Sequence, residues 1–370
     1  MIQTGSGIFA TRKIFSSYSP EPLFVTCPLK RHLSWKVISK ALVFLILILL
    51  TSLSQASLPY YLLRATMSPD HLQTHIELKN FLSSRYIYLH EGICGRSKNH
   101  LLASSESGQM ACIKRYPKLK QEIRGELYSY HFSQWLGHYN VPAIVLTRLS
   151  YTDEFWSPWK SKLIELGWHD GDYLVVSHYY QQLSDVTLPD ILRTNKTLNL
   201  TTKGHYTKTE ITQWSNLIVQ DYLSGDTDRL VNTLVNLEHN KHMYSYPIHN
   251  LGQTKDLGLI AYDHDYAFGV GYDFALSKRY QTLNQKYQRY QVHFLNRLCL
   301  FSSATQQKLE TLSSYEDPAQ ILEDYIQRVD LDSFLLVKPL TKEHRTLFKH
   351  RIRHALKHLH ECQATPSINP

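Results

Sequence analysis

The sequence predicts an α+β protein with two lobes, a small β-rich lobe followed by a larger helical lobe, behind an N-terminal transmembrane helix. Three observations lead to this fold class. Short apolar runs bounded by turn residues, which are typical of strands, occur mainly between residues 86 and 180. After Thr187 the apolar residues mostly follow helical spacing. Residues 41–63 contain no charged side chain.

The uncharged segment is long enough to cross a bilayer. Its 23 residues would extend about 35 Å as a helix. Basic residues precede it, so the positive-inside rule places the N-terminus in the cytosol and the rest of the chain in the lumen. We therefore expect a type II signal-anchor in a thin membrane of the early secretory pathway. A cleaved signal peptide ending at "SQA" and a buried core helix are the alternatives.

This topology divides the chain into five expected segments. They are a cytosolic tail at 1–40, a transmembrane signal-anchor at 41–63, a lumenal stem at 64–82, a β-rich lobe at 83–180 and a helical lobe at 181–365.

The positive charge is concentrated in the tail. The chain carries a net charge of +8, and residues 1–40 hold six basic residues against one acidic residue. The remaining chain is nearly balanced, with no general basic surface. This charge distribution argues against a nucleic-acid partner.

Cysteines and glycosylation motifs agree with a lumenal location. Cys94, Cys112, Cys299 and Cys362 follow the anchor, an even number in an oxidising compartment. Four cysteines allow three pairings, of which Cys94–Cys112 with Cys299–Cys362 is the local choice. Two sequons begin at Asn195 and Asn199 in a polar stretch that we expect to be a glycosylated surface loop.

The β-rich lobe begins with a hairpin signal. Residues 100–103 and 110–116 are short apolar runs around "SSESGQ". A helix is expected at 120–137, ending near Gly137, and strands at 141–150 and 172–180. The last strand, "DYLVVSHYY", would join the two lobes.

The helical lobe opens with a capping box. Thr207 and Glu210 have the S/T-x-x-E spacing at the start of a helix over 207–225. A buried strand with a polar turn is expected at 257–272, and helices to the end. His350, His354 and His358 recur every four residues on the last helix. A zinc stripe is conceivable, but a solvated basic face is favoured.

Four charged residues stand in the order that phosphoryl transfer requires. Lys114 ends a strand, Glu126 lies on the next helix, Asp228 lies in "GDTDR" and Asp263 follows an apolar strand. A strand lysine contacts nucleotide phosphates, a helix glutamate holds it, one aspartate orients the attacking hydroxyl and a second binds metal. Each residue alone could be a surface, cap or turn residue. The prediction rests on their joint order, which is typical of a protein-kinase-like fold that uses ATP and a divalent metal, Mg or Mn.

Two further segments bear on this chemistry. "EGICGRSKN" would cover the phosphates, with Gly95 and Asn99 as candidate nucleotide contacts. The alternative enzyme class is a Golgi glycosyltransferase, in which Asp263-His264-Asp265 would bind a metal and a nucleotide sugar. That class is expected to alternate strands and helices, which this chain does not do.

The stretches "CGRSKN…MACIKRY", "EIRGELYSYHFSQWLG", "DYLSGDTDRLVNTLVN", "YDHDYAFGVGY" and "RLCLF" resemble the four-jointed family of type II Golgi kinases. The similarity runs from Cys94 to Cys362 and includes all four lumenal cysteines. The resemblance implies that Lys114 binds nucleotide, Glu126 is its partner, Asp228 is the catalytic base and Asp263 binds metal.

This chain departs from the family and from protein kinases at two places. Asp265 stands where the family usually has glutamate. The asparagine expected five residues after the base is Thr233, so Asn232 or Asn236 would hold the second metal position. We take Asp263 and Asn232 as the predicted metal ligands.

The resemblance also implies a biological role. It suggests an enzyme of the Golgi membrane, with its catalytic domain in the lumen. The sequence leaves open whether cleavage of the stem releases an extracellular form. It would phosphorylate Ser/Thr in cadherin repeats of Fat- and Dachsous-type proteins, with a role in planar cell polarity and growth signalling. A pseudokinase that binds cadherin repeats without modifying them is the non-enzymatic alternative.

Overall fold

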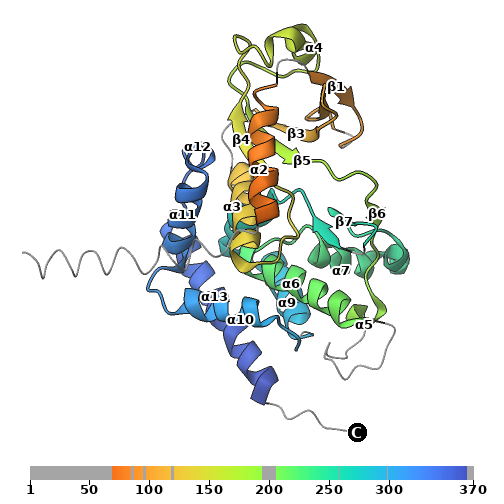
Figure 1. Ribbon diagram of the computed structural model, residues 1–370. Coiled ribbons are helices and arrows are strands. Elements are labelled where there is room, and N and C mark those ends of the chain that lie inside the picture. The colour runs from red at the N-terminus through yellow and green to blue at the C-terminus, as the bar shows by residue number, and fades with distance from the viewer. Residues whose placement is uncertain are drawn as a thin grey trace, which may run out of the picture. The chain divides into compact units, whose positions relative to one another are not determined.

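The computed structural model describes residues 69–84, 87–94, 97–117, 121–193, 206–256, 258–297 and 299–364 (Figure 1). The predicted tail and transmembrane segment, Gly95, Asn195 and Asn199 lie outside these residues. In the part of the chain that the structure describes, no helix combines the length and apolarity needed to cross a membrane.

The first described helix belongs to the folded body. Helix α2 (Pro69–Phe81) falls in the segment expected to be a polar stem. Leu78 and Phe81 have no exposed surface, and His75 is 4% exposed. These residues share one face at helical spacing, so the helix packs that face inward, while the apolar Leu72 and Ile76 on its other side are exposed. This part of the expected stem at 64–82 is therefore a helix that packs against the folded body.

Five antiparallel strands form the main sheet, in the order β1-β2-β3-β5-β4. They are β1 (Ile87–Glu91), β2 (His100–Ser105), β3 (Met110–Tyr116), β4 (Ile144–Arg148) and β5 (Tyr173–His178). The predicted hairpin is confirmed as the β2–β3 pair, in which His100 lies opposite Lys114. On its other edge β3 pairs with β5, so Lys114 lies at the centre of the sheet.

Helix α3 (Gln121–Leu136) runs beside this sheet and is buried along almost its whole length. The helix was expected from sequence, and its burial on all sides follows from its place between the sheet and the helical lobe (Figure 1). The sequence did not predict the insertion between β4 and β5, which holds η1 (Ser157–Trp159) and α4 (Lys160–Glu165). There Trp159 donates a hydrogen bond to the Ile87 carbonyl (3.1 Å) and so covers the β1 edge.

The second lobe is mainly helical, as expected. Its helices are α5 (Asp190–Arg193), α6 (Lys208–Ser224), α7 (Leu230–His239), η2 (Lys241–Ser245), α8 (Gly271–Leu276), α9 (Gln281–Leu295), α10 (Ser303–Ser313), α11 (Pro318–Val329), α12 (Leu331–Phe334) and α13 (Lys342–Ala364). A three-stranded sheet is formed by β6 (Ser184–Asp185), β7 (Leu251–Gln253) and β8 (Leu259–Ala261). The turn η3 (Tyr266–Val270) follows.

Several local predictions can be compared with the structure. Thr207 and Glu210 form the capping box of α6. On α13 the apolar face is buried as expected, but the histidine stripe is not a fully solvated face. His350 is exposed, whereas His354 is half-buried and its Nδ1 lies 2.7 Å from the Tyr222 hydroxyl. Of the three possible cysteine pairings, the structure has Cys94–Cys112 and Cys299–Cys362.

Candidate active site

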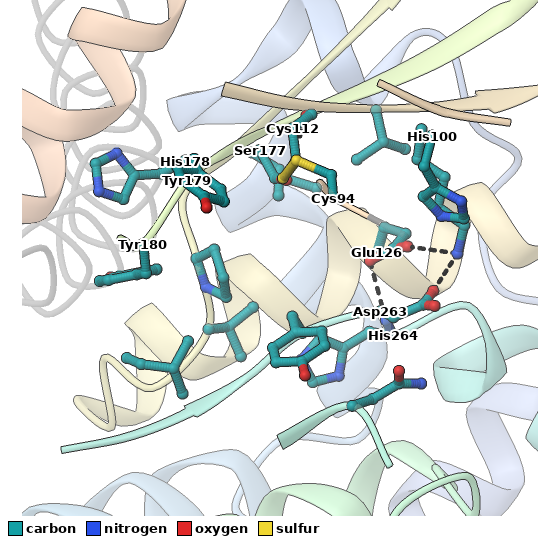
Figure 2. Close-up of a pocket in the computed structure, with 18 of the residues that line it drawn as sticks. Cys94, His100, Cys112, Glu126, Ser177, His178, Tyr179, Tyr180, Asp263 and His264 are labelled. Atoms are coloured by element: carbon teal, nitrogen blue, oxygen red, sulfur yellow. Dashed lines mark hydrogen bonds and ion pairs between the residues drawn. A yellow bond between two sulfur atoms is a disulfide. The ribbon is translucent and has the colours of Figure 1, made fainter. Parts of the chain in front are cut away.

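A cavity of about 690 Å³ lies between the main sheet and the helical lobe. The sheet contributes Cys112, Lys114 and Val175, and the segment after β5 contributes Tyr179 and Tyr180. On the opposite side are Asn250, which precedes β7, and Tyr262 and Asp263, which follow β8. The strand expected to join the lobes therefore also forms a wall of the cavity (Figure 2).

Lys114 brings three acidic groups together at this cavity. Its Nζ lies 3.3 Å from Glu126 Oε1 and 3.0 Å from Asp265 Oδ2, and it also contacts Asp263 Oδ1. Burial opposes the charged ammonium, but Glu126, Asp263 and Asp265 outweigh it and raise the lysine pKa. Four residues, from β3, from α3 and from the turn after β8, thus meet at one charged centre, in which Glu126 and Asp263 are labelled in Figure 2.

Glu126 is held on both carboxylate oxygens. The Tyr116 hydroxyl donates to Oε1 (3.1 Å), and the His264 backbone N–H donates to Oε2 (3.0 Å). The preceding residue, Gly125, permits this approach: a Cβ there would lie 2.3 Å from the His264 carbonyl oxygen. Gly125 therefore leaves the space in which the backbone of the turn at His264 can approach the helix, and Glu126 supplies the carboxylate that this backbone binds.

The Asp263-His264-Asp265 turn supplies oxygen ligands. Asp263 has a backbone φ of +56°, a left-handed conformation that is uncommon outside glycine, asparagine and aspartate. Burial and the neighbouring Asp263 raise the pKa of Asp265 to about 7, although Lys114 opposes this shift. Carboxylate oxygens are the ligands that Mg²⁺ and Mn²⁺ prefer, so Asp263 and Asp265 have the chemistry to hold a divalent metal. Among the described residues their oxygens do not form a three-carboxylate cluster with Glu126, whose own oxygens accept from Tyr116, Lys114 and His264.

Asp228 lies in the turn between α6 and α7. Helix α6 ends at Gly225, whose φ is +76°. Asp226 accepts a hydrogen bond from the Asp228 backbone N–H (3.0 Å), which gives it the turn role expected from sequence. Burial disfavours the charge of Asp226, but Arg229 at 2.7 Å and His264 outweigh burial and lower its pKa to about 2.

The side chain of Asp228 is surrounded by donors. Asn250 Nδ2 donates to Oδ2 at 2.8 Å, His249 Nδ1 lies 3.0 Å from the same oxygen, and Asn232 Nδ2 donates to Oδ1 at 3.3 Å. Burial and Asp226 raise the pKa of Asp228, while His249 opposes the shift. Sequence reasoning missed His249 and Asn250, because nothing in "IHN" marks its contact with a turn about twenty residues earlier.

Arg229 connects the turn that carries Asp226 and Asp228 to the segment that carries Asp263. It is completely buried and binds Asp221 (2.6 Å) and Asp226 (2.7 Å) through Nη2. Its Nη1 donates to the Tyr262 carbonyl (3.3 Å), and Nη2 lies 3.0 Å from His264 Nδ1. This network fixes the Asp228 turn relative to the segment that carries Asp263.

Two predicted site residues lie elsewhere than expected. Asn99 Oδ1 accepts from Arg115 Nε (3.1 Å) and Nη2 (2.9 Å), and Asn99 does not belong to the described cavity lining. Arg115 and Lys114 are adjacent on a strand and point to opposite faces, which takes Asn99 away from the lysine. Asn232 contacts Asp228 and Asn236 rather than Asp263. Its role as a metal ligand remains a prediction.

The fold and this arrangement define a protein-kinase-like protein. The structure is similar to a Golgi casein kinase, with a TM-score of 0.50, 13% sequence identity, and coverage of 79% of this chain and 76% of that chain. It is also similar to hydra Fam20, solved with sugar, with a TM-score of 0.51, 13% identity, and coverage of 84% and 96%.

Sequence comparison gives the family. The four-jointed box protein middle domain matches residues 73–365, and the chain therefore belongs to the four-jointed box family. It is 29% identical to four-jointed box protein 1 of Xiphophorus maculatus over 277 residues, which is 73% of this chain and 62% of that protein. It is 24% identical to the extracellular serine/threonine protein kinase four-jointed of Drosophila melanogaster over 336 residues, 76% and 55% of the two chains. The chain thus spans less than two thirds of these relatives.

Proposed function

We propose that this chain is a Ser/Thr protein kinase of the secretory pathway that transfers the γ-phosphoryl group of ATP. The observation that carries the proposal is the meeting of Lys114, Glu126 and Asp263 at the cavity. The kinase-like fold and a Drosophila relative named as an extracellular Ser/Thr kinase support it.

The residues take different parts in this reaction. Lys114 would bind nucleotide phosphates, which compete with Asp263 and Asp265 for its ammonium group. Glu126 keeps the lysine in place through contacts on both of its oxygens. Asp263 and Asp265 would hold Mg²⁺ or Mn²⁺, which when bound neutralises charge on the phosphates. A relative in fold, the Golgi casein kinase, has been solved with Mn and ADP.

Asp228 is the carboxylate that we place beside the attacking Ser/Thr hydroxyl. It is partly exposed, with 20% of its side chain accessible, and Asn232, His249 and Asn250 fix its orientation. We propose that the acceptors are cadherin repeats of Fat- and Dachsous-type ectodomains, met in the Golgi by a membrane-anchored enzyme. A role in planar cell polarity and growth signalling follows from these acceptors. The support for these acceptors is family membership.

Phosphate transfer to cadherin-repeat fragments tests the proposal. Full-length protein would be incubated with γ-labelled ATP and Mn²⁺ or Mg²⁺, as wild type and as Asp263→Ala. We expect incorporation on Ser/Thr by wild type only. Binding of the fragments without incorporation would instead support the pseudokinase, and equal incorporation by both proteins would exclude catalysis by this site.

The structure does not favour the glycosyltransferase alternative. The strand pairs of the five-stranded sheet are all antiparallel, whereas that class was expected to alternate strands with helices. Both aspartates of Asp263-His264-Asp265 also contact Lys114, a partner that a phosphoryl-transfer site explains.

A further inference from the structure

The segment that follows the Asp263 turn is basic, although the body of the protein is nearly balanced in charge. Residues 274–309 hold six basic residues and no acidic residue. Lys278, Arg279 and Arg289 of this stretch are exposed. Among the described residues, none of these three side chains has an acidic partner. Their charges are therefore available to an acidic group on another molecule.

The same stretch also exposes apolar side chains. Tyr266 on η3, Leu276 on α8, Tyr280 before α9 and Leu283 on α9 are between 41% and 45% exposed. Helix α8 packs against both η3 and α9, so these side chains come from neighbouring elements. Single exposed apolar residues are ordinary in proteins, but several on neighbouring elements indicate a surface that binds another molecule.

A row of aromatic contacts runs through this surface. Phe274 of α8 stacks with Tyr280, with ring centroids 6.1 Å apart, and meets Tyr287 of α9 edge-on at 5.2 Å. The guanidinium group of Arg279 lies 5.3 Å from the centroid of the Tyr280 ring. The row therefore has Tyr287 at one end and a cation at the other.

The Tyr287 end of the row lies at the turn that carries Asp228. Gln291 of α9 donates a hydrogen bond from Nε2 to the Asp226 carbonyl (3.2 Å), which holds the helix against this turn. Burial and the negative charge of Asp228 raise the pKa of both Tyr266 and Tyr287, so both hydroxyl groups lie within the influence of that carboxylate. The aromatic row thus extends from the proposed catalytic aspartate to the exposed cations.

We propose that this surface, formed by Tyr266, Lys278, Arg279, Tyr280 and Leu283, binds the acceptor polypeptide next to its Ser/Thr and selects acceptors that carry acidic side chains several residues away. We call it the acceptor-docking surface. The inference rests on the proposed kinase function and adds a substrate preference to it.

The distribution of charge sets where the acidic side chains must lie. Asp226, Asp228 and Asp263 make the centre of the site acidic, so acidic residues directly beside the Ser/Thr would be repelled. The contacts between Tyr287 and Arg279 measure 5.2 to 6.1 Å each. An extended chain advances about 3.3 Å per residue, so the cations are reached roughly four to six residues from the Ser/Thr.

Continuity with Asp228 favours the acceptor as the occupant of this surface. Cations beside apolar side chains also suit an anionic membrane. A membrane, however, gives no reason for the row of rings to reach the proposed catalytic turn, whereas a polypeptide held at Asp228 must lie over the residues next to it.

Peptides with a single serine test the preference. Three peptides of equal length would carry glutamate, glutamine or lysine roughly four to six positions from the serine on both sides. We expect wild type to show a KM about 10-fold lower for the glutamate peptide than for the glutamine peptide, with a similar kcat. The difference should shrink at high salt, because exposed ion pairs are screened.

A charge reversal provides the decisive variant. Lys278→Glu combined with Arg279→Glu should lose the preference for glutamate and prefer the lysine peptide by a similar factor. Activity on the lysine peptide would show that the variant is folded. The matched control is Arg353→Glu combined with Lys357→Glu, which reverses two exposed charges on α13 and should keep the wild-type preference.

The outcomes separate this inference from the proposed function. If wild type phosphorylates all three peptides equally, or the Lys278→Glu, Arg279→Glu variant keeps the preference for glutamate, the docking role is wrong while the kinase function stands. If wild type phosphorylates neither the peptides nor the cadherin-repeat fragments, both are overturned.

A vesicle assay covers the membrane alternative. The variant could keep wild-type peptide kinetics but lose the additional binding that phosphatidylserine gives to phosphatidylcholine vesicles. That result would assign the surface to a membrane and overturn the proposal.

Discussion

Lys114 carries one positive charge among three acidic side chains, from Glu126, Asp263 and Asp265. The imbalance leaves the cavity wall acidic, which is unfavourable for anionic phosphates unless a cation also binds. A divalent ion removes this conflict, because the same carboxylates that repel phosphate become its ligands. The single lysine and the metal are therefore expected to act together in nucleotide binding.

Replacing Lys114 tests its role in nucleotide binding. In Lys114→Met the ammonium is lost, and a hydrogen bond to a charged group is worth about 1.5–3 kcal/mol. We expect the Kd for Mn-ADP, measured by calorimetry, to rise about 10- to 100-fold. Lys338→Met, at an exposed lysine outside the cavity lining, should leave the Kd unchanged. An unaltered Kd for Lys114→Met would remove the lysine from the binding site.

Asp265 gives nucleotide binding a pH dependence. Its pKa is raised to about 7 by burial and by Asp263, so the folded protein holds a proton there below pH 7. A metal ion must displace that proton, so its binding should strengthen as pH rises through about 7. We expect the thermal stabilisation of wild type by Mn-ADP to increase from pH 6 to pH 8. Asp265→Asn should show a smaller stabilisation that changes less with pH, and equal pH dependence in both proteins would contradict this role.

At the scale of elements, α3 and the Asp263 turn touch because one helical position has no side chain. A Cβ on Gly125 would lie 2.3 Å from the His264 carbonyl oxygen and 2.6 Å from that of Ala267, both backbone atoms. Helix propensity alone predicts that Gly125→Ala stabilises the protein by up to about 1 kcal/mol. The clash predicts the opposite, a loss of about 1–3 kcal/mol. Denaturant unfolding of the variant decides between the two signs.

A second inter-element contact is a buried ionic cluster. Asp330, between α11 and α12, has no exposed side-chain surface. Lys79 of α2 lies 3.1 Å away, His75 of the same helix 3.7 Å and His131 of α3 3.6 Å. Burial disfavours the charged carboxylate, but the neighbouring His131 and His75 outweigh it and lower the pKa of Asp330. The cluster joins the first described helix to the helix that carries Glu126.

Removing the buried anion should be costly. Asp330→Ala leaves Lys79, His75 and His131 around an apolar side chain, and breaking a buried pair typically costs about 3–5 kcal/mol. We expect that loss in the free energy of unfolding. The matched control is Asp332→Ala, because Asp332 also faces Lys79 (3.6 Å) but is 84% exposed, and it should cost less than about 1 kcal/mol. If both variants lost a similar free energy of unfolding, the burial of Asp330 would not account for its contribution to stability.

At the scale of the whole molecule, two disulfides restrain the unfolded chain. Cys94–Cys112 spans 18 residues and Cys299–Cys362 spans 63 residues. Loop-closure entropy predicts stabilisation of about 3 and about 4 kcal/mol respectively. We expect the variant in which both Cys299 and Cys362 are replaced by Ser to lose more free energy of unfolding in denaturant titrations than the variant in which both Cys94 and Cys112 are replaced. The Cys94–Cys112 variant should in addition weaken Mn-ADP binding, because this disulfide lines the cavity and the other does not.

Much of the architecture could be predicted from local pattern. Strand and turn signals marked the β2–β3 hairpin, and the capping box at Thr207 marked the start of α6. The order of Lys114, Glu126 and Asp263 was sufficient to expect that they meet, because the kinase-like fold requires it. The insertion with η1 and α4 was not expected, since its aromatic residues are buried by contacts with distant strands.

The placement of individual contacts was harder to predict. Asn99 was expected at the nucleotide, but strand alternation directs it to Arg115 on the other face. The segment at 69–81 was expected to be a polar stem because it carries many polar residues, but its Leu78 and Phe81 are buried by a body whose residues lie later in the chain. Such contacts depend on packing between elements, which local pattern does not encode.

The sequence by itself determined the two-lobed fold class, the family and the four charged residues, because these depend on periodicity, order and short-range spacing. Beyond the expected Lys114–Glu126 pair, the tertiary structure alone decided which partners those residues have. It placed Asp265 on Lys114, Arg229 between the two acidic turns, and His249 on Asp228. Each partner comes from a different part of the chain. Hydrogen bonds and ion pairs act over a few ångströms in space, however many residues separate their members, and only the folded chain brings those members together.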